Sequence, residues 1–183
     1  MADVIIIGDG PGGLSAALFL AKNGQQVTVF GQDETPMHYA LLRNYLGIPE
    51  MTGIDFQKIA REQVQGFGAN LQDQRVASVE KTAAGFAVTT EGGERHESKY
   101  LVIGEGKGLK LVTSLGLSTT HEGAEVDRNY RTSIDKLYVI GRSTRIQRSQ
   151  AIISAGSGAV AALDILSTEK GKDFNDFDSV PKG

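Results

Sequence analysis

The chain has 183 residues, enough for one ordinary domain with its own hydrophobic core. Hydrophobic residues make up 40% of it and charged residues 22%, which is typical of globular proteins. The net charge of −3 argues against non-specific binding to nucleic acid. The sequence has no cysteine, which excludes disulfides, thiolate catalysis and iron–sulfur clusters within these residues.

The histidines and the apolar runs exclude further classes of protein. His38, His96 and His121 are too far apart in the sequence for a local metal site, so we expect no metal. The N-terminus lacks the basic region of a signal peptide, and no apolar run approaches the length of a membrane span, about 18 residues. We therefore expect a soluble cytoplasmic protein with no membrane partner and no nucleic-acid partner.

The first thirty residues have the pattern of a βαβ unit. Residues 4–7 are a short β-branched run, typical of a strand buried on both faces. A glycine-rich turn follows, then a helix rich in alanine and leucine over residues 14–23, and a second strand over residues 27–30. A strand, helix and strand in this order predict a parallel sheet.

The middle of the chain predicts a helix and then antiparallel strands. Residues 55–67 form an amphipathic helical pattern. Residues 69–79, 85–90 and 94–99 then alternate in strand fashion, and glycines stand at the breaks between them. We expect these three strands to form a small antiparallel β-meander.

The last part of the chain predicts two more buried strands, over residues 100–103 and 137–140, and a helix over residues 151–166 with small residues on one face. Residues 107–133 are rich in turns and are expected to wrap the surface. The fold class is therefore α/β, a Rossmann-like three-layer fold with a parallel sheet and the small meander. Residues 1–166 are expected to form a single domain, and residues 167–183 a polar tail.

The glycine loop after the first strand is the clearest functional signal. G-x-G-x-x-G alone is weak evidence in a chain with 23 glycines, but here it follows a buried strand and opens a helix. In that context Gly8 permits the tight turn, Gly10 admits a pyrophosphate against bare backbone, and Gly13 allows the helix to pack closely. The amides of the first helical turn then face the phosphates. The loop predicts a dinucleotide site.

The usual partner of this loop is an acid at the end of the second strand, which binds the adenosine ribose. Gly31 stands there instead, and Asp33 and Glu34 follow it. Either acid could reach back to the ribose, or the backbone alone could hold it.

Several segments together resemble the thioredoxin-reductase family, within the pyridine nucleotide-disulfide oxidoreductases. Residues 3–30 resemble the FAD-binding start of that family, and residues 44–49 (NYLGIP) resemble its asparagine-containing segment beside the flavin. Residues 131–141 are similar to the run into its second FAD motif. Residues 150–158 resemble the helix whose N-terminus faces the flavin ring. The resemblance implies an FAD-binding domain.

The departures from that family are specific. The family inserts an NADPH-binding domain with a redox cysteine pair between the halves of its FAD domain, whereas a short connection follows Gly104 here. The chain therefore resembles small stand-alone FAD-domain members and is expected not to be a dithiol reductase. Arg142 stands where the family has an aspartate on the ribityl chain, so both customary carboxylates are missing.

The resemblance implies a set of cofactor-binding residues but no catalytic acid–base pair. In this set Asn44 would bind the flavin or its ribityl chain, and the amides of Gln150 and Ala151 would face the ring. The full set is Gly8, Gly10, Pro11, Gly12, Gly13, Gly31, Gln32, Asp33, Asn44, Val76, Gly104, Gly141, Arg142, Gln150 and Ala151.

Three functions remain open from the sequence. The first is an FAD-dependent oxidoreductase whose electron donor is NAD(P)H or a ferredoxin-like protein. The second is a non-catalytic FAD-binding or regulatory subunit, and the third is an interaction module that has lost the flavin. We also expect a homodimer, formed through the small-residue helix face and the tail at Phe174 and Phe177. Five arginines within residues 128–148 are expected to rim the flavin site.

Overall fold

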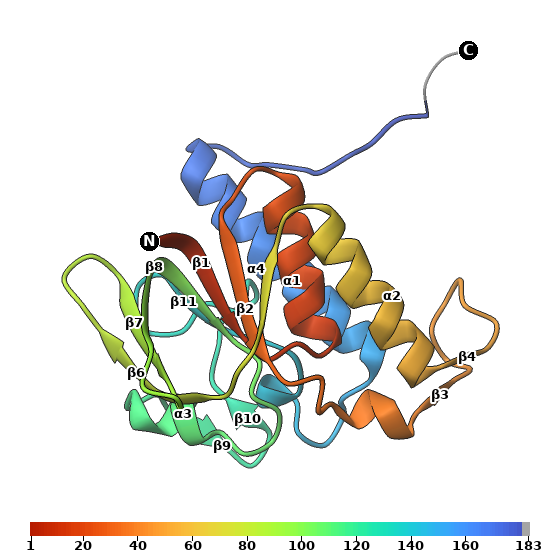
Figure 1. The fold of residues 1–183 in the computed structure, drawn as a ribbon, viewed down its shortest axis with the longest axis horizontal. Coiled ribbons are helices and arrows are strands. Elements are labelled where there is room, and N and C mark those ends of the chain that lie inside the picture. Colours follow the sequence, from red (N-terminus) through yellow and green to blue (C-terminus); the bar gives the residue numbers. More distant parts are fainter. Residues whose placement is uncertain (181–183) are drawn as a thin grey trace.

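A seven-stranded sheet organises the fold in the computed structural model, which describes residues 1–180 (Figure 1). Its strands lie in the order β5-β2-β1-β8-β7-β6, and β11 also pairs with β8. The parallel strands are β5 (Asn70–Asp73), β2 (Val27–Gly31), β1 (Ala2–Ile7), β8 (Arg95–Ile103) and β11 (Leu137–Val139). The antiparallel strands are β7 (Phe86–Thr90) and β6 (Val76–Lys81).

The inner parallel strands are buried on both faces, as their continuous apolar runs predict; these are β1, β11 and the second half of β8. In β1, Val4 and Ile6 point into one core, and Ile5 and Ile7 point into another on the opposite face. The same alternation continues through β8 and β11. The sheet is therefore the middle layer of three.

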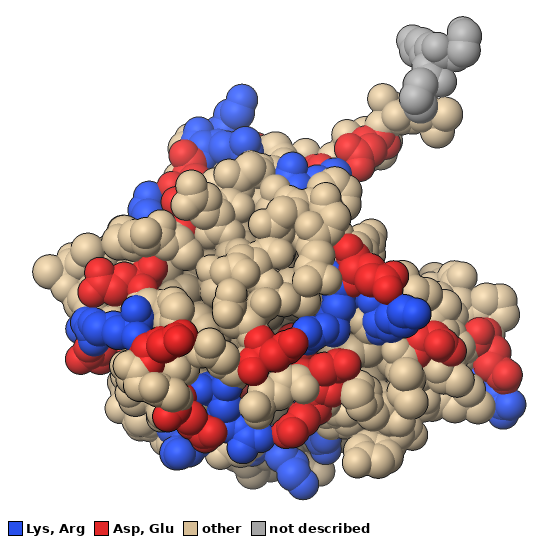
Figure 2. Space-filling view, viewed as in Figure 1, with Lys and Arg blue, Asp and Glu red and all other residues tan. Residues whose placement is uncertain are grey.

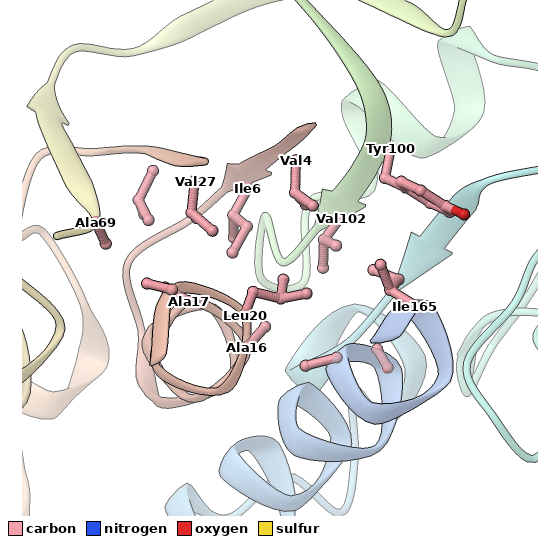
Figure 3. Packing of buried hydrophobic residues seen from close by; sticks show 14 of the residues in the cluster. Val4, Ile6, Ala16, Ala17, Leu20, Val27, Ala69, Tyr100, Val102 and Ile165 are labelled. Atoms are coloured by element: carbon pink, nitrogen blue, oxygen red, sulfur yellow. The ribbon is translucent and has the colours of Figure 1, made fainter. Parts of the chain in front are cut away.

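Helices cover one face of this sheet (Figure 1). They are α1 (Pro11–Lys22), α2 (Gly53–Gly66) and α4 (Ala151–Lys170). Figure 3 shows their core, in which Leu20 of α1 and Ile165 of α4 point toward Val102 and its neighbours on the sheet. Each of these three side chains is fully buried. Burial of this apolar surface is the main force that holds the helices on the sheet.

On the other face of the parallel strands, side chains of the meander and of a short helix complete a second core. Phe86 and Val88 of β7 pack on this side of the sheet. Helix α3 (Lys110–Ser114) packs beside them through Leu111 and Val112, and the hairpin of β9 (Thr119–Thr120) and β10 (Gly123–Ala124) follows it. Most of residues 107–133 are exposed, as expected of a segment that wraps the surface, but their leucines and Val112 also complete this second core.

The three-layer α/β fold with its meander is confirmed, but two strand boundaries differ. Residues 69–79 were expected to be one strand of the meander. They form β5, which pairs with β2 at the parallel edge, and β6, which starts the meander. Conversely, residues 95–103 form one continuous strand that pairs with β7 through its first half and with β1 and β11 through its second.

Helix α4 continues to Lys170, four residues beyond the expected end, and packs along α1. By length and composition alone it could cross a membrane. Its contacts show instead a helix of the core, because Ala161, Ala162, Ile165 and Leu166 are fully buried against the sheet and α1.

The segment after α4 is tied to α1 over part of its length. Phe174 packs on the helix-side core, and Asp176 accepts a hydrogen bond from Lys22 at 2.8 Å. The expected tail therefore begins after Lys170, and its residues 181–183 lie outside the described residues. Acidic and basic side chains are interspersed over the face shown in Figure 2.

Candidate functional site

A cavity of about 770 Å³ opens at the carboxyl ends of the parallel strands. Ile7 at the end of β1, Phe30 in β2, Gly104 after β8 and Ile140 after β11 all line it. Ligands of open α/β sheets bind at this edge, where the loops leave the strands. The glycine loop between β1 and α1 forms one wall.

Two glycines of the loop are required by close backbone approaches. Gly8 has φ +100°, and a Cβ there would overlap the carbonyl oxygen of Gly104, which follows β8. A Cβ at Gly13 would overlap the carbonyl oxygen of Gly8 itself. Gly13 therefore serves the loop's own conformation, in addition to the close helix packing expected from the sequence.

Gly10 is a different case. Only a methyl carbon of Thr35, at 4.0 Å, would lie near a Cβ on Gly10, so the space above this residue is open cavity. Gly10 is also the N-cap of α1, and no side chain caps the helix there. The first-turn amides thus remain free for a negatively charged ligand in the cavity, as the sequence predicts.

Asp9, between the first two glycines, is a site residue that the sequence reasoning missed. Its side chain is only 5% exposed, and its Oδ2 accepts a hydrogen bond from the Asp33 amide at 2.9 Å. Arg61 of α2 forms an ion pair with the same oxygen and a second one with Asp73, at 2.6 Å. The side chain of Gln57 donates to the Asp9 carbonyl at 2.5 Å. The sequence signal that could have revealed Asp9 is its position, since it is an acid inside a phosphate-binding loop.

Burial raises the pKa of the Asp9 carboxyl above its ordinary value, while the hydrogen bond from Asp33 and the charge of Arg61 act in the opposite direction. Desolvation disfavours a buried carboxylate unless partners compensate for the lost water. The ionised form therefore depends on the contact with Arg61.

The Asp9 side chain has room in the loop because residue 31 is a glycine. A Cβ on Gly31 would overlap the Asp9 carboxyl group and lie 2.6 Å from the Asp9 Cβ. The expected alternative, Asp33, does not line the cavity. Its backbone has φ +55°, and its carboxylate pairs with His38 Nε2 at 3.2 Å. Glu34 does line the cavity, but it forms an ion pair with Arg75 at 2.9 Å.

At the other end of the cavity, Asn44 donates a hydrogen bond from Nδ2 to Oε1 of Gln150 at 2.9 Å. Asn44 lies between the short strands β3 (Leu41–Leu42) and β4 (Met51–Thr52), and Gln150 is the N-cap of α4. The structure thus brings together two predicted site residues that are 106 positions apart. The N-terminus of α4 opens on the cavity through Gln150 and Ala151.

Arg142 also lines the cavity, in the 3₁₀ turn η2 (Gly141–Thr144) after β11. Its Nε is buried and has no hydrogen-bond partner within the described residues. A buried polar group without a partner is costly, so this nitrogen has unused capacity to donate to a ligand.

The other arginines do not rim this cavity, contrary to the expectation from their spacing. Arg131 pairs with Asp164 of α4 at 2.5 Å. The remaining three line a separate polar cavity on the β10 side, together with acidic residues: Arg128, Arg145 and Arg148, with Glu122, Glu125 and Asp127.

Every predicted cofactor-binding residue except Asp33 lines the cavity. These are Gly8, Gly10, Pro11, Gly12, Gly13, Gly31, Gln32, Asn44, Val76, Gly104, Gly141, Arg142, Gln150 and Ala151. The sequence reasoning missed the apolar wall that the turn η1 (Pro36–Tyr39) and β3 provide through Met37 and Leu42. No local motif marks such a wall.

Comparison with known sequences identifies relatives. Residues 2–108 match the family described as pyridine nucleotide-disulphide oxidoreductase. The chain is 32% identical over 111 residues to a thioredoxin reductase of Helicobacter pylori, which is 58% of this chain and 36% of that protein. It is 31% identical over 123 residues to a ferredoxin–NADP reductase of Lactococcus lactis, 63% of this chain and 38% of that protein. The chain thus spans little more than a third of these relatives' length.

Solved structures show the same fold. The atypical thioredoxin reductase TRi of Desulfovibrio vulgaris Hildenborough aligns over 93% of this chain and 99% of its own, with a TM-score of 0.84 and 18% identity. The thioredoxin reductase of Streptococcus pyogenes aligns with a TM-score of 0.87 and 14% identity, over 93% of this chain and 99% of its own. The match to the family covers more than half of the chain and includes the glycine loop, so the chain belongs to the pyridine nucleotide-disulphide oxidoreductases, a family of FAD-binding flavoproteins.

Proposed function

We propose that the chain binds FAD in the cavity at the strand ends and acts there as a flavin-dependent oxidoreductase. The observation that carries this proposal is the cavity's continuity. It runs from the uncapped N-terminus of α1 at Gly10 to the hydrogen-bonded pair of Asn44 and Gln150. A dinucleotide with a flavin at one end needs a phosphate cradle and a separate ring site, and the cavity offers both.

The residues present fit the pyrophosphate of FAD. The bare backbone at Gly10 leaves room for phosphate oxygens, and the first-turn amides of α1 can donate to them. The unpartnered Nε of Arg142 is a further donor on the same cavity. A guanidinium beside two phosphates is favourable.

The residues at the α4 end fit a ring site. Asn44 and Gln150 fix each other's side chains, so their remaining polar atoms have a defined direction. Bound FAD would supply the electron-transfer chemistry of its isoalloxazine ring. The protein's part is to place that ring, to exclude water with Met37 and Leu42, and to set the field with the positive end of α4.

The electron donor is part of the proposal. The names of the relatives include a thioredoxin reductase and a ferredoxin–NADP reductase, so we test NAD(P)H and a reduced ferredoxin as donors. These 183 residues contain no cysteine, so no dithiol within them can relay the electrons. We place the reaction in the cytoplasm and in a homodimer.

A second candidate is a non-catalytic FAD-binding subunit. The observation that favours it is the short connection between Gly104 and β11, which leaves no room for a nucleotide domain between the two halves of the cavity. Both candidates require FAD, and they differ only in whether a donor reduces it.

The deciding experiment has two steps. The purified chain is first titrated with FAD and with FMN, and we expect tight binding of FAD alone. The complex is then mixed without oxygen with NADH, NADPH or reduced ferredoxin while the flavin absorbance near its visible maximum is followed. Rapid bleaching by one donor supports the oxidoreductase, whereas tight binding without bleaching favours the subunit. Absence of any FAD binding would contradict both candidates.

A further inference from the structure

The acid that recognises the ribose of a bound dinucleotide stands, in sites of this type, at the end of the second strand. That position is Gly31 here, at the end of β2. The structure nevertheless places a carboxylate at this point, because the Asp9 side chain covers the Cα of Gly31 so closely that a Cβ there would overlap its carboxyl group. Both residues line the cavity.

The geometry also shows why an aspartate at position 9 requires a glycine at position 31. A side chain at position 31 and the Asp9 side chain compete for the same volume, so only one of the two positions can carry an acid. Asp9 uses Oδ2 for the Asp33 amide and for Arg61. Within residues 1–180 no other residue donates a hydrogen bond to its Oδ1, so this oxygen can accept one from a ligand.

Arg61 makes this arrangement compatible with a nearby pyrophosphate. An unpaired carboxylate in a phosphate-binding loop would repel the ligand. The guanidinium of Arg61, 17% exposed in its side chain, forms ion pairs with Asp9 and with Asp73 of β5. The ion pair between Arg61 and Asp9 fixes the carboxyl group through Oδ2 and offsets its charge. Oδ1 can still accept a hydrogen bond from a hydroxyl group.

We propose that Asp9 is the ribose-recognising acid of this protein, moved from the end of β2 onto the glycine loop, and that Gly31 is the space this move requires. The inference rests on the proposed function, since it concerns the adenosine half of FAD. It assigns the hydrogen bond from an adenosine ribose hydroxyl to Oδ1 of Asp9, with Arg61 as the positioning residue.

The test exchanges the two positions. FAD affinity and the ratio of the affinities for ADP and 2′-deoxy-ADP are measured by calorimetry for the parent chain, Asp9→Gly, Gly31→Glu and Asp9→Gly with Gly31→Glu. The matched control is Asp73→Asn, which removes the other carboxylate on Arg61 but lies outside the cavity. Thermal unfolding of each variant reports separately on the fold.

The parent chain is expected to prefer ADP by about tenfold, the usual effect of one hydrogen bond to a charged group. Asp9→Gly should lose that preference and bind FAD about tenfold more weakly. Gly31→Glu should be strongly destabilised, because its side chain meets Asp9. The double variant should fold better than Gly31→Glu and recover the preference. Asp73→Asn should keep it.

The outcomes separate the inference from the proposed function. If the parent binds FAD but Asp9→Gly keeps the full preference for ADP, the inference is overturned and FAD binding stands. If the double variant is no more stable than Gly31→Glu, the competition for space is refuted. If Asp9→Gly fails to fold, the ratio of the affinities for ADP and 2′-deoxy-ADP is measured on Asp9→Asn, which keeps the side-chain volume. A parent that binds neither FAD nor ADP overturns both ideas.

Discussion

Gly10 and Gly13 lie three residues apart in one loop, but their missing side chains serve different purposes. A Cβ on Gly13 would overlap the carbonyl oxygen of Gly8, so the fold itself excludes a side chain there. A Cβ on Gly10 would enter open cavity, so only a ligand would exclude it. A side chain at position 13 should therefore affect folding, whereas a side chain at position 10 should affect ligand binding.

Replacement of Gly10 by valine should abolish FAD binding and change the free energy of unfolding by no more than about 1 kcal/mol, the scale of an N-cap substitution. Replacement of Gly13 by alanine should instead destabilise the protein by about 2 kcal/mol, because the loop must shift. Denaturant unfolding and FAD titration of both variants check this. Equal loss of stability in the two variants would refute the distinction.

Arg142 is the second residue for which we propose a role in ligand binding. Its buried Nε has no partner within the described part of the chain. Arg142→Gln should raise the dissociation constant of FAD about tenfold by removing a charge-assisted hydrogen bond. The salt dependence of FAD binding should also become weaker than in the parent. An unchanged dissociation constant at low salt would show that Arg142 does not contact the phosphates.

At the scale of elements, α4 is held by its small residues and by its C-terminal end. Gly158 faces α1, where a Cβ would overlap the Gly12 carbonyl oxygen and lie 3.0 Å from the Ala16 nitrogen. Of the small residues expected to form the dimer contact, Gly158 and Ala162 pack within the chain, Ala155 and Ala159 are half-buried, and Gly156 is exposed. This packing brings α4 against the glycine loop and so aligns both ends of the cavity.

Gly158→Ala should destabilise the protein by about 2 kcal/mol, because both backbones must separate. Gly156, two residues earlier on the exposed side, meets nothing within 4 Å. Gly156→Ala should therefore stabilise the protein by about 0.5–1 kcal/mol through helix propensity alone. Chemical denaturation of the pair measures the difference, and a common sign for both changes would contradict this account of the α1–α4 contact.

The far end of α4 is attached to β8 through Glu169. Hydrogen bonds from Lys99 at 2.7 Å and from the Tyr100 hydroxyl at 2.7 Å lower the pKa of this carboxyl. Because the folded pKa lies below the unfolded one, the stabilisation is present above the unfolded pKa and disappears as the pH falls through the folded one. Glu169→Gln should cost about 1 kcal/mol at pH 7. The difference in stability between the two proteins should shrink as the pH falls below the ordinary pKa of a glutamate, as thermal unfolding at several pH values would show.

At the scale of the whole molecule, apolar surface remains exposed on the helical side. A groove of about 270 Å³ between α1 and α2 is lined mostly by apolar side chains, and Ile59 on its rim is 51% exposed. Ile152 and Ile153 of α4 are also exposed. Phe174 packs on its own chain and Phe177 is 80% exposed, so only the latter of the two expected tail residues is free for a partner.

Exposed apolar surface of this kind supports the expected homodimer, since it is the kind of surface that proteins bury by association. Light scattering at micromolar concentration should give twice the chain mass. Ile59→Asp should return the mass of one chain and leave FAD binding intact, because Ile59 lies outside the cofactor cavity. A parent chain of single mass at this concentration would refute the homodimer.

The sequence by itself determined the βαβ unit, the glycine loop and the position of the cavity. These features depend on residues close together in the chain, such as the apolar run before Gly8 and the uncapped helix after Gly10, and local geometry follows from them. The order of the motifs was also sufficient to identify the family.

Only the tertiary structure decided which distant residues meet. Residues 69–79 alternate like a single strand, but their pairing partners divide them, because β2 is available to the first part and β7 to the second. Asp9 and Gly31 each stand out in their own segments, but no local pattern connects the two residues. Their relation appears when parallel pairing of β1 with β2 places the ends of both strands side by side. Strand pairing and side-chain volume act between residues far apart in sequence, so no local pattern records them.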